Sequence, residues 1–500
     1  MPKRNEDKLP KNRPKNLGEL KKSGWQSRSV KEELRENLIK KISAGEKIFD
    51  GIIGYEKTVL PQIENAILSK HNFILLGLRG QAKSRIIRLL ATLLDEYIPV
   101  IPGTLLNEDP FNPISPKAKT MVQEQGDKLP IEWLSRDDRY HEKLATPDVS
   151  IADLIGDIDP IKAAREKLDI SNEEVIHWGI VPRTNRGIFA INELPDLQPR
   201  IQVGLLNILE ENDIQVRGFP LRVPLDMLLV FTANPEDYTN RGNIITPLKD
   251  RVDSQILTHY PKSLGDAKKI TTQEVSHDAK NIKIPELVSD IVEEVSFQAR
   301  DSEYVDQSSG VSARVSISAY ECLLSNIERR ALNVGDKDFF PRMCDLYSTL
   351  PAITGKIELV YEGEQDGPVL VAHRLIGQAI SQVFAKHFPK PSREKTGPSP
   401  QVHSNPYEAI MDYFSSGKKL SLSDDLSLPE YSDRLEGVAG LKDVVKKYFN
   451  TNDKREMLLR MEFVLEALHQ NNMLSREVHD SIIQYTDVFS DMLKDMGGFN

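Results

Sequence analysis

The chain has 500 residues, of which 39 % are hydrophobic and 28 % are charged, and its formal net charge is −10. This composition excludes a largely disordered chain, and no apolar run reaches the roughly 18 residues that a membrane-spanning helix needs. The negative charge argues against nucleic-acid binding by the whole chain, because neutralisation of phosphates dominates such binding. Two cysteines, Cys322 and Cys344, and an N-terminus without the apolar core of a secretory signal lead us to expect a cytoplasmic protein.

The first 30 residues are expected to form a basic, flexible arm. Residues 1–31 carry ten Lys or Arg against three Asp or Glu. A solvated tail is one interpretation of this charge, and a docking arm for an acidic partner is the other. Residues 31–43 have apolar residues at helical spacing, so an amphipathic helix should open the first domain, 31–260.

A strand, a glycine-containing loop and a helix are predicted next. The strand is NFILLG, residues 72–77, and the helix is SRIIRLLATLLDEY, residues 84–97. This order opens α/β nucleotide-binding folds. Two later apolar runs, 187–192 and 227–234, each end in a polar side chain, which is typical of parallel strands buried on both faces. The predicted fold class is therefore an α/β parallel sheet flanked by helices.

Beyond about residue 260 the hydrophobic pattern becomes helical. We expect an α-helical lid over residues 261–388. Residues 389–406 are rich in Pro, Ser and Gly and are predicted to be a linker. A C-terminal helical module is predicted for residues 407–500.

The loop after the first strand has the spacing G-x-x-G-x-x-K-S, which suits a polyphosphate. Small residues expose backbone N–H groups, a helix N-terminus faces the anion, a lysine reaches the β- and γ-phosphates and a hydroxyl binds Mg²⁺. ATP and Mg²⁺ are therefore the predicted ligands. Alanine stands where glycine usually precedes the lysine, and it is tolerable there if its φ is negative. The residues assigned to the nucleotide are Gly77, Gly80, Gln81, Ala82, Lys83, Ser84 and Arg85.

An acid follows the second predicted strand. Glu193 lies 110 positions after Lys83 and can act as the general base toward the water that attacks the γ-phosphate. Asn192 stands where an aspartate would normally hold the water shell of Mg²⁺. Its amide keeps an acceptor oxygen but lacks the negative charge, so metal affinity should fall. Alternatively, Glu193 only caps a helix that starts near Pro195.

Three more polar residues complete the predicted site. Asn234, after the third strand, should lie beside Glu193 in a parallel sheet and orient the attacking water. Arg251, in a turn after that strand, and Arg314, at an expected helix start, are suited to stabilise the charge that develops during phosphoryl transfer. Either arginine alone would be more typical of an ordinary surface.

The order of these motifs resembles that of AAA+ ATPases, in the clade of the magnesium chelatase I subunit and the MoxR-type ATPases. GQAKS is similar to the MoxR variant of the Walker A loop. Residues 145–163 and 177–218 resemble the chelatase passage from the insertion in the second helix to Walker B and a following β-hairpin. VFTANPED, LKDRVD and GVSARVS are similar to the sensor 1, arginine-finger and sensor 2 segments. The resemblance covers about residues 50–330.

This resemblance implies a role for each site residue. Lys83 and Ser84 would bind phosphate and magnesium, and Glu193 would activate water. Asn234 would be sensor 1, Arg251 would reach the nucleotide of a neighbouring subunit and Arg314 would be sensor 2. The implied assembly is a homo-oligomeric ring, often a hexamer. The segment that resembles the one beside the adenine is Ile53, Gly54 and Tyr55.

Members of this clade often work for a partner with a von Willebrand factor A domain. This chain has no D-x-S-x-S stretch, so such a partner would be a separate protein. We expect an ATP-driven remodelling or metal-insertion chaperone. A non-hydrolysing, nucleotide-gated scaffold is an alternative if Asn192 abolishes metal binding. An enhancer-binding transcription activator is less favoured, because there is no GAFTGA-like loop and residues 407–500 show no basic recognition helix. Neither nucleic-acid binding nor membrane insertion is expected.

Overall fold

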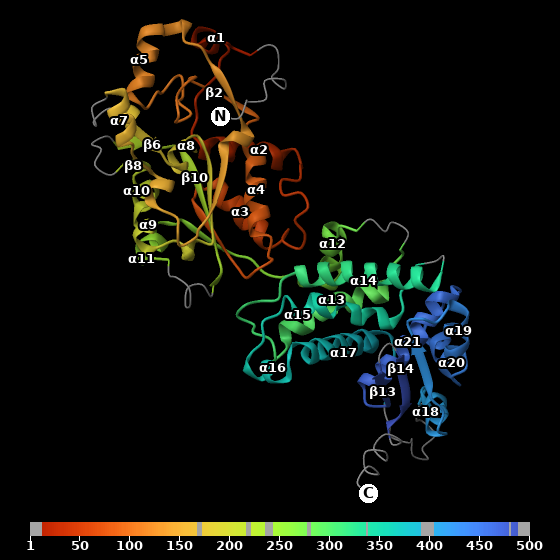
Figure 1. The fold of residues 1–500 in the computed structure, drawn as a ribbon. Coiled ribbons are helices and arrows are strands. Elements are labelled where there is room, and N and C mark those ends of the chain that lie inside the picture. The colour runs from red at the N-terminus through yellow and green to blue at the C-terminus, as the bar shows by residue number, and fades with distance from the viewer. Residues whose placement is uncertain are drawn as a thin grey trace. The chain divides into compact units, whose positions relative to one another are not determined.

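The protein divides into two compact units, unit 1 (Met1–His259) and unit 2 (Tyr260–Asn500) (Figure 1). Each unit has hydrophobic clusters of its own. No helix in the described part of the chain is long and apolar enough to cross a membrane. The computed structural model describes residues 13–167, 173–216, 222–235, 244–277, 282–336, 339–391, 405–479 and 482–488.

Unit 1 is built on a five-stranded parallel sheet in the order β11-β1-β10-β7-β4. Successive residues of the inner strands point to opposite faces, so that Phe189 and Ile191 enter one core cluster while Ile188 and Ala190 enter another. The three predicted strands are confirmed as the inner strands β1, β7 and β10. The five strands are β1 (Phe73–Leu76), β4 (Tyr140–Leu144), β7 (Gly187–Asn192), β10 (Met227–Ala233) and β11 (Ser254–Leu257).

Helices cover both faces of this sheet (Figure 1). One face is covered by α2 (Val30–Ser43), α3 (Val59–Leu68) and α4 (Lys83–Leu90). The cluster on the other face includes residues of α6 (Ile151–Leu154), α8 (Ile180–Arg183), α9 (Pro199–Gly204), α10 (Leu206–Glu210) and α11 (Thr246–Arg251). The remaining elements of unit 1 are α1 (Leu17–Lys22), α5 (Pro116–Gln125), α7 (Pro160–Glu166) and the short strands β2 (Tyr97–Val100), β3 (Glu132–Ser135), β5 (Gly156–Ile158), β6 (Ile176–Trp178), β8 (Asp213–Gln215) and β9 (Arg222–Pro224).

The helix after the loop is shorter than the sequence predicts. It ends at Leu90, a 3₁₀ turn follows at Ala91–Leu93, and β2 starts at Tyr97 instead of a continued helix. Side chains of α2 form hydrogen bonds with the backbone groups that the end of the helix leaves without partners. Asn37 donates to the carbonyl of Leu93 at 2.9 Å, and the N–H of Asp95 donates to Glu33 at 2.6 Å. Those bonds replace the ones that a continued helix would have made.

The N-terminal segment is packed from residue 13 onward, which corrects the expectation of a flexible arm over residues 1–30. The N–H of Leu17 donates to Leu129 at 2.9 Å, and the N–H of Ile131 donates to Lys15 at 2.9 Å. Trp25 packs edge-on against Trp133, with ring centroids 5.9 Å apart. Residues 1–12 lie outside the described residues.

A buried ion pair fixes α2 to the strands that carry the site. Arg139, just before β4, donates to both oxygens of Glu33 on α2, at 2.8 and 2.6 Å. Both side chains are nearly inaccessible, with exposed fractions of 1 % and 4 %. The same arginine donates through Nε to the carbonyl of Arg186, just before β7, at 2.7 Å. One guanidinium group thus joins α2, β4 and β7.

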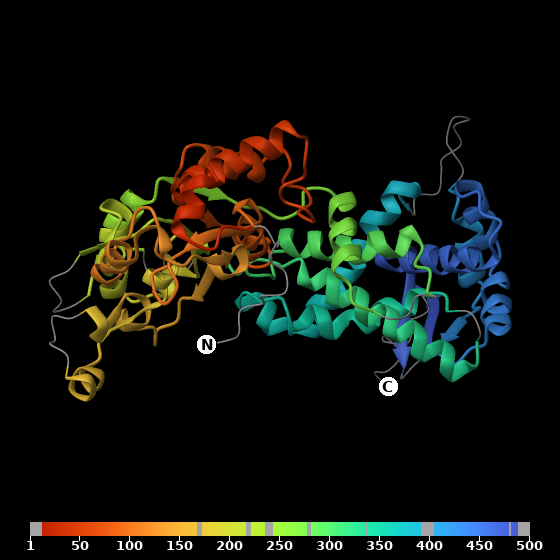
Figure 2. The same cartoon turned by 90° about the horizontal axis from the view of Figure 1, so that it is seen from above.

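Unit 2 is mainly helical, and α13 lies between α14 and α17 (Figures 1 and 2). It also contains a three-stranded antiparallel sheet, β12-β14-β13, which the sequence did not lead us to expect. Its elements are α12 (Leu264–Glu274), α13 (Glu286–Asp301), α14 (Arg314–Val334), η8 (Met343–Thr349), α15 (Leu350–Thr354), α16 (Tyr361–Asp366), α17 (Pro368–His387), α18 (Glu408–Ser415), β12 (Leu420–Ser423), α19 (Leu428–Glu436), α20 (Leu441–Tyr448), α21 (Lys454–Gln470), β13 (Leu474–His479) and β14 (Ile482–Asp487).

The expected lid and the expected C-terminal module share one hydrophobic core. It extends from Leu287 on α13 to Tyr485 on β14. Phe384 of α17 packs against Phe463 of α21, with ring centroids 5.6 Å apart. The two segments are therefore parts of a single unit. Of the predicted linker, residues 392–404 lie outside the described residues.

Candidate nucleotide site

The loop between β1 and α4 is fitted closely to its neighbours. The N–H of Gly77 donates to the carbonyl of Ala233 on β10 at 3.1 Å. A Cβ atom at Gly77 would lie 1.8 Å from Oγ1 of Thr258, so no larger residue fits there. Gly80 has a φ of 72°, a left-handed conformation that glycine adopts without strain. Glycine is thus favoured at each of these two positions for a different reason: Gly77 has no room for a Cβ atom, and Gly80 has a positive φ.

Ala82 is left-handed, so the condition under which alanine would be tolerated at this position, a negative φ, is not met. Its φ is 57° and its ψ is 14°, and it forms the N-cap of α4. A non-glycine residue in this conformation costs roughly 1–2 kcal/mol, because its Cβ approaches the following carbonyl oxygen. Alanine therefore fits the loop only at a cost in backbone strain, which the usual glycine would avoid.

Lys83 is the first residue of α4, and it is only 7 % exposed. Its amine donates to the carbonyl of Gly77, to the carbonyl of Leu78 at 3.1 Å and to Oδ1 of Asn234 at 2.9 Å. A buried ammonium group needs such acceptors. The loop carbonyls and Asn234 thus hold the cation at the N-terminus of α4, where an anion is also favoured.

The sheet order brings the predicted polar residues to one edge. β10 lies between β1 and β7, and Ile191 is paired with Phe231. The ends of β7 and β10 are joined by Thr232, whose Oγ1 accepts from the N–H of Glu193 at 3.0 Å and donates to Oδ1 of Asn192 at 3.3 Å. Asn234 follows β10 at the same edge. It therefore stands between the strand that carries the loop and the strand that carries the acid.

The backbone of Glu193 does not fit a simple capping role. Its φ is 56°, and its side chain makes no capping hydrogen bond to the 3₁₀ turn that it precedes, Leu194–Asp196. Glu193 thus occupies the N-cap position of this turn, but its side chain does not cap the turn. A left-handed glutamate costs conformational energy, and such strain is concentrated at functional sites.

The residues at the loop suit magnesium only together with a nucleotide. No group of three or more His, Cys, Asp or Glu in the described part of the chain is placed to hold a metal ion. Ser84 is half-buried in the first turn of α4, and Asn192 ends β7. Mg²⁺ commonly takes few protein ligands and completes its shell with water and substrate phosphates. A hydroxyl and an amide oxygen fit that mode of binding.

The segment Ile53, Gly54 and Tyr55 is tied to the loop. The hydroxyl of Tyr55 donates to the carbonyl of His259 at 2.6 Å and lies 3.1 Å from the carbonyl of Gln81. The rings of Tyr55 and His259 meet edge to face, with centroids 4.9 Å apart. A shift of this segment would therefore be transmitted directly to the loop of residues 77–84.

Sequence reasoning missed Thr258, which braces the loop from β11. Its hydroxyl donates to Oε1 of the buried Gln81 at 2.6 Å. Gln81 thus has a structural contact within the protein in addition to its predicted place in the motif. Thr258 could not be found from the sequence because the strand before it, β11, was not predicted: its sequence SQIL has only two apolar residues.

The two predicted arginines lie in different units. Arg251 ends α11, where a turn was expected, and its Nη2 lies 2.7 Å from Oε2 of Glu210 on α10. Arg314 begins α14 of unit 2, at the predicted helix start, and is exposed.

None of the known protein-family models matches the chain. Among solved structures, the chain is similar to a complex of the subunits BchI and BchD of magnesium chelatase, with 18 % identity over 64 % of this chain and 98 % of that one and a TM-score of 0.34. It is also similar to a putative ATPase from Cytophaga hutchinsonii, with 15 % identity, coverage of 72 % and 97 % and a TM-score of 0.30. For NtrX from Brucella abortus in complex with ATP the identity is 13 %, the coverage is 57 % and 52 %, and the TM-score is 0.33. Because these identities and TM-scores are low, the similarities do not establish the function, and we argue it from the residues at the loop.

Proposed function

We propose that the protein is an ATPase that binds ATP and Mg²⁺ at the loop of residues 77–84. The observation that carries this proposal is the position of the Lys83 amine. It lies at a helix N-terminus, 2.9 Å from Oδ1 of Asn234. Asn234 follows β10, and Glu193 follows the neighbouring strand β7. A phosphate-binding cation, an amide and a carboxylate at one sheet edge are the parts that phosphoryl transfer to water requires.

Each residue then has a distinct task. Lys83 and the N–H groups at the start of α4 bind the phosphates, while Ser84 and Asn192 hold Mg²⁺. The bound ion would neutralise charge on the phosphate oxygens. Glu193 accepts the proton of the attacking water, and Asn234 orients that water. Since Lys83 already has three acceptors, it exchanges part of this set for phosphate oxygens when ATP binds.

The quaternary part of the proposal is a homo-oligomeric ring, with six subunits as the favoured number. Arg251 would act on the nucleotide of the next subunit, and Arg314 would act from the lid. In the ring, Arg251 would exchange its ion pair with Glu210 for contact with the neighbouring nucleotide. Such a ring would remodel, or insert a metal into, a separate partner protein with a von Willebrand factor A domain.

A second candidate function is supported by Asn192. An amide brings no negative charge to the metal, so a nucleotide-gated scaffold that binds ATP without hydrolysing it is the alternative. Steady-state hydrolysis by the full chain distinguishes the two functions, with fluorescent nucleotide binding followed in parallel.

The decisive comparison is between wild type, Lys83→Ala and Glu193→Gln. We expect turnover in wild type, none in either variant, and loss of nucleotide binding only in Lys83→Ala. The exposed Lys22 and Glu46 supply the controls, Lys22→Ala and Glu46→Gln, which should behave as wild type. Binding without turnover in wild type would favour the scaffold. Nucleotide binding that survives Lys83→Ala unchanged would refute the proposed site itself.

A further inference from the structure

Unit 1 contains two adjoining cavities apart from the proposed nucleotide site. The first has a volume of about 330 Å³ and the second a volume of about 180 Å³. Both are lined by Leu105, Lys162, Ile176 and Trp178, so the two cavities lie side by side. None of the described residues that we assign to ATP or Mg²⁺ lines either cavity. A ligand bound there would therefore occupy a site of its own.

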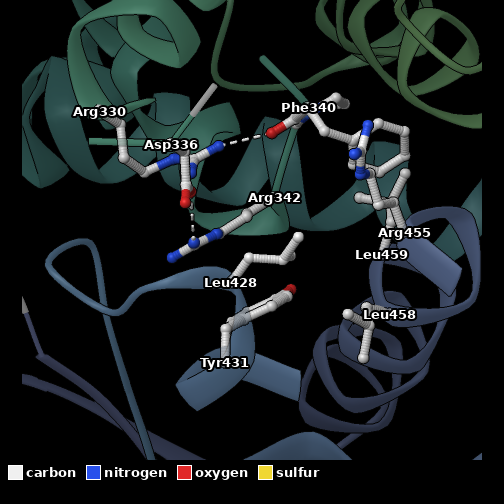
Figure 3. A pocket seen from close by; sticks show the side chains of 10 residues that line it. Arg330, Asp336, Phe340, Arg342, Leu428, Tyr431, Arg455, Leu458 and Leu459 are labelled. Carbon is white, nitrogen blue, oxygen red and sulfur yellow. Dashed lines mark hydrogen bonds and ion pairs between the residues drawn. The ribbon is translucent and has the colours of Figure 1, made fainter. Parts of the chain in front are cut away.

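These cavities offer far more room for a ligand than the small cavity of unit 2 in Figure 3, whose volume is about 50 Å³. One water molecule needs roughly 10–15 Å³ of such volume, so the cavity of unit 2 holds at most about five waters. Its Arg330 is also neutralised, because it donates to Asp345 at 3.0 and 2.9 Å. By the same measure, the first cavity of unit 1 has room for a molecule of roughly 20 non-hydrogen atoms.

Apolar side chains make up most of the surface that the two cavities share. Ile176 and Trp178 are alternate residues of β6, so they lie on one face of the strand, and their exposed fractions are only 4 % and 7 %. Leu105, in the loop after β2, is 51 % exposed. A ligand that covers this leucine and fills the first cavity removes apolar surface from water, which favours binding.

Hydrogen bonds already fix the loop that carries Leu105. Nδ2 of Asn107 donates to the carbonyls of Arg183 and Asn185, at 3.0 and 3.1 Å. In return, Nδ2 of the fully buried Asn185 donates to the carbonyl of Leu106 at 2.7 Å. The wall thus needs little ordering when a ligand binds, and the entropic cost of binding is correspondingly small.

Lys162 is the charged residue that lines both cavities. Its amine donates to the carbonyl of Glu174, and it forms no ion pair with any described carboxylate. An ammonium group has three N–H donors, and this carbonyl uses one of them. Lys117 differs, because its amine is paired with the Glu174 carboxylate at 3.1 Å. Lys162 therefore offers a ligand a positive charge that the described carboxylates do not already neutralise.

The other carboxylates of the walls are bound to backbone N–H groups. Glu108, which is fully buried, accepts from the N–H groups of Ile114 and Ser115 at 2.7 and 3.1 Å. Asp159 is the N-cap of α7 and accepts from two N–H groups of its first turn, at 3.0 and 2.9 Å. Neither carboxylate forms an ion pair with the amine of Lys162.

The second cavity has an excess of positive charge. Two cations, Lys162 and Arg183, line it together with one carboxylate, Asp159. Nε of Arg183 donates to the carbonyl of Gly179 at 3.0 Å, so this contact of the guanidinium group is to a neutral acceptor. A single anionic group on a ligand would restore the balance of charge.

We propose that the two cavities bind a small molecule with an apolar body and one carboxylate group. The apolar body lies in the first cavity, against Ile176 and Trp178. The carboxylate accepts from the amine of Lys162, near the second cavity, where Arg183 adds positive charge. Charge-assisted hydrogen bonds are stronger than neutral ones, so the carboxylate is the group that the site recognises. Binding needs neither ATP nor Mg²⁺.

Calorimetric titration of the full chain with three compounds of one apolar skeleton tests the proposal. Phenylbutyrate, phenylbutanol and phenylbutylamine differ in the terminal group, which is a carboxylate, a hydroxyl or an ammonium group. We expect one phenylbutyrate per chain, bound at least about tenfold more tightly than phenylbutanol, because only the carboxylate makes an ionic contact with Lys162. Phenylbutylamine should bind most weakly. No binding of phenylbutyrate, or equal affinities for the three compounds, overturns the proposal.

Lys162→Gln should abolish the preference for the carboxylate. Phenylbutyrate should then bind about as weakly as phenylbutanol, while the affinity for phenylbutanol stays as in wild type. Arg165→Gln is the matched control, because Arg165 is exposed on the same helix and lines neither cavity. It also removes one positive charge but should keep the preference. A preference that survives Lys162→Gln, or that is lost equally in Arg165→Gln, contradicts the proposal.

Leu105→Ala tests the position of the apolar body. It should weaken the binding of phenylbutyrate and phenylbutanol by the same factor, at least about threefold, because both cover this side chain. Leu105 is exposed, so we expect the variant to fold, which circular dichroism checks. Ile161→Ala is the control, since Ile161 is exposed on α7 and lines neither cavity. Unchanged affinities in Leu105→Ala would place the ligand elsewhere and overturn the proposal.

Discussion

The amine of Lys83 lies 2.9 Å from the side-chain oxygen of Asn234, so a direct hydrogen bond joins the start of α4 to the residue after β10. The two residues are 151 positions apart in sequence. They meet because β10 pairs directly with β1, which places the end of β10 beside the loop. The cation that we propose to bind phosphate and the amide that we assign to water are therefore joined directly by a hydrogen bond.

Asn234→Ala should lower ATP turnover at least tenfold, which corresponds to about 1.4 kcal/mol of transition-state stabilisation. ATP binding should persist, because Lys83 keeps its two carbonyl acceptors in the loop. Steady-state hydrolysis and fluorescent nucleotide binding measure the two effects separately. Asn207→Ala, at an exposed position on α10, is the control. Loss of binding as complete as in Lys83→Ala would contradict the assigned role.

Asn192→Asp should raise turnover when Mg²⁺ is limiting and have little effect when it saturates. The aspartate keeps an acceptor for the Thr232 hydroxyl, which now donates to Oδ1 of Asn192 at 3.3 Å, and adds the missing negative charge. Hydrolysis is measured as a function of Mg²⁺ concentration in both proteins. Equal rates with equal Mg²⁺ dependence would show that the amide does not limit the metal site.

Ala82→Gly should stabilise unit 1 by about 0.5–1 kcal/mol, because glycine has no Cβ to strain a φ of 57°. Part of the relief is offset by the greater freedom of glycine in the unfolded chain. Scanning calorimetry of the full chain measures the change. Ala91, with a φ of −58°, supplies the opposite control, since Ala91→Gly should destabilise by about 0.5–1 kcal/mol. A loss of stability in both variants would argue against strain at Ala82.

Arg139→Met should destabilise unit 1 by about 3–5 kcal/mol, because it leaves the Glu33 carboxylate buried without its charge partner. Adding Glu33→Gln should recover part of this loss, since the amide oxygen still accepts from the N–H of Asp95. Lys41→Met removes an exposed pair with Glu46 and should cost less than about 1 kcal/mol. Thermal unfolding measures all three. Equal losses for Arg139→Met and Lys41→Met would contradict a structural role for the buried pair.

Glu462 should make the stability of unit 2 fall as pH rises. Burial raises the pKa of this carboxyl group from 4.5 to about 7, although the Tyr431 hydroxyl and the Met343 N–H donate to it. Because the folded state holds the proton more tightly than the unfolded state, the favourable contribution is complete below about pH 4.5 and is lost as pH rises through about 7. In Glu462→Gln this component should be absent. Unfolding midpoints between pH 4.5 and 8 test this, and identical profiles for the two proteins would refute it.

The inner strands of the sheet were predictable because their side chains are apolar on both faces. β7 has the predicted bounds, Gly187–Asn192. The outer strands were not predicted. β4 has the sequence YHEKL and β11 has SQIL, and each is paired on one side only, so neither needs a continuous apolar run.

The predicted site residues follow from motif spacing, but their conformations do not. Nothing in GQAKS shows that Ala82 is left-handed, because that φ follows from how the loop joins β1 to α4. Thr258 was missed since its role depends on a strand that the sequence did not reveal. In unit 2, the alternation LSLS at residues 420–423 was a signal for β12, but four residues are too few to distinguish a strand from a loop.

The positions of the strands in the sequence determine when each sheet can be completed during translation. All five strands of the parallel sheet have been made once residue 257 has left the ribosome, so unit 1 can complete its sheet early. The small sheet differs, because its central strand, β14, is the last to be made and pairs with both β12 and β13. Helices α13, α14, α15 and α17 share their core with this sheet. The core that these helices share with the sheet therefore cannot be completed until the chain has been translated to about residue 487, well after the loop of residues 77–84 has been made.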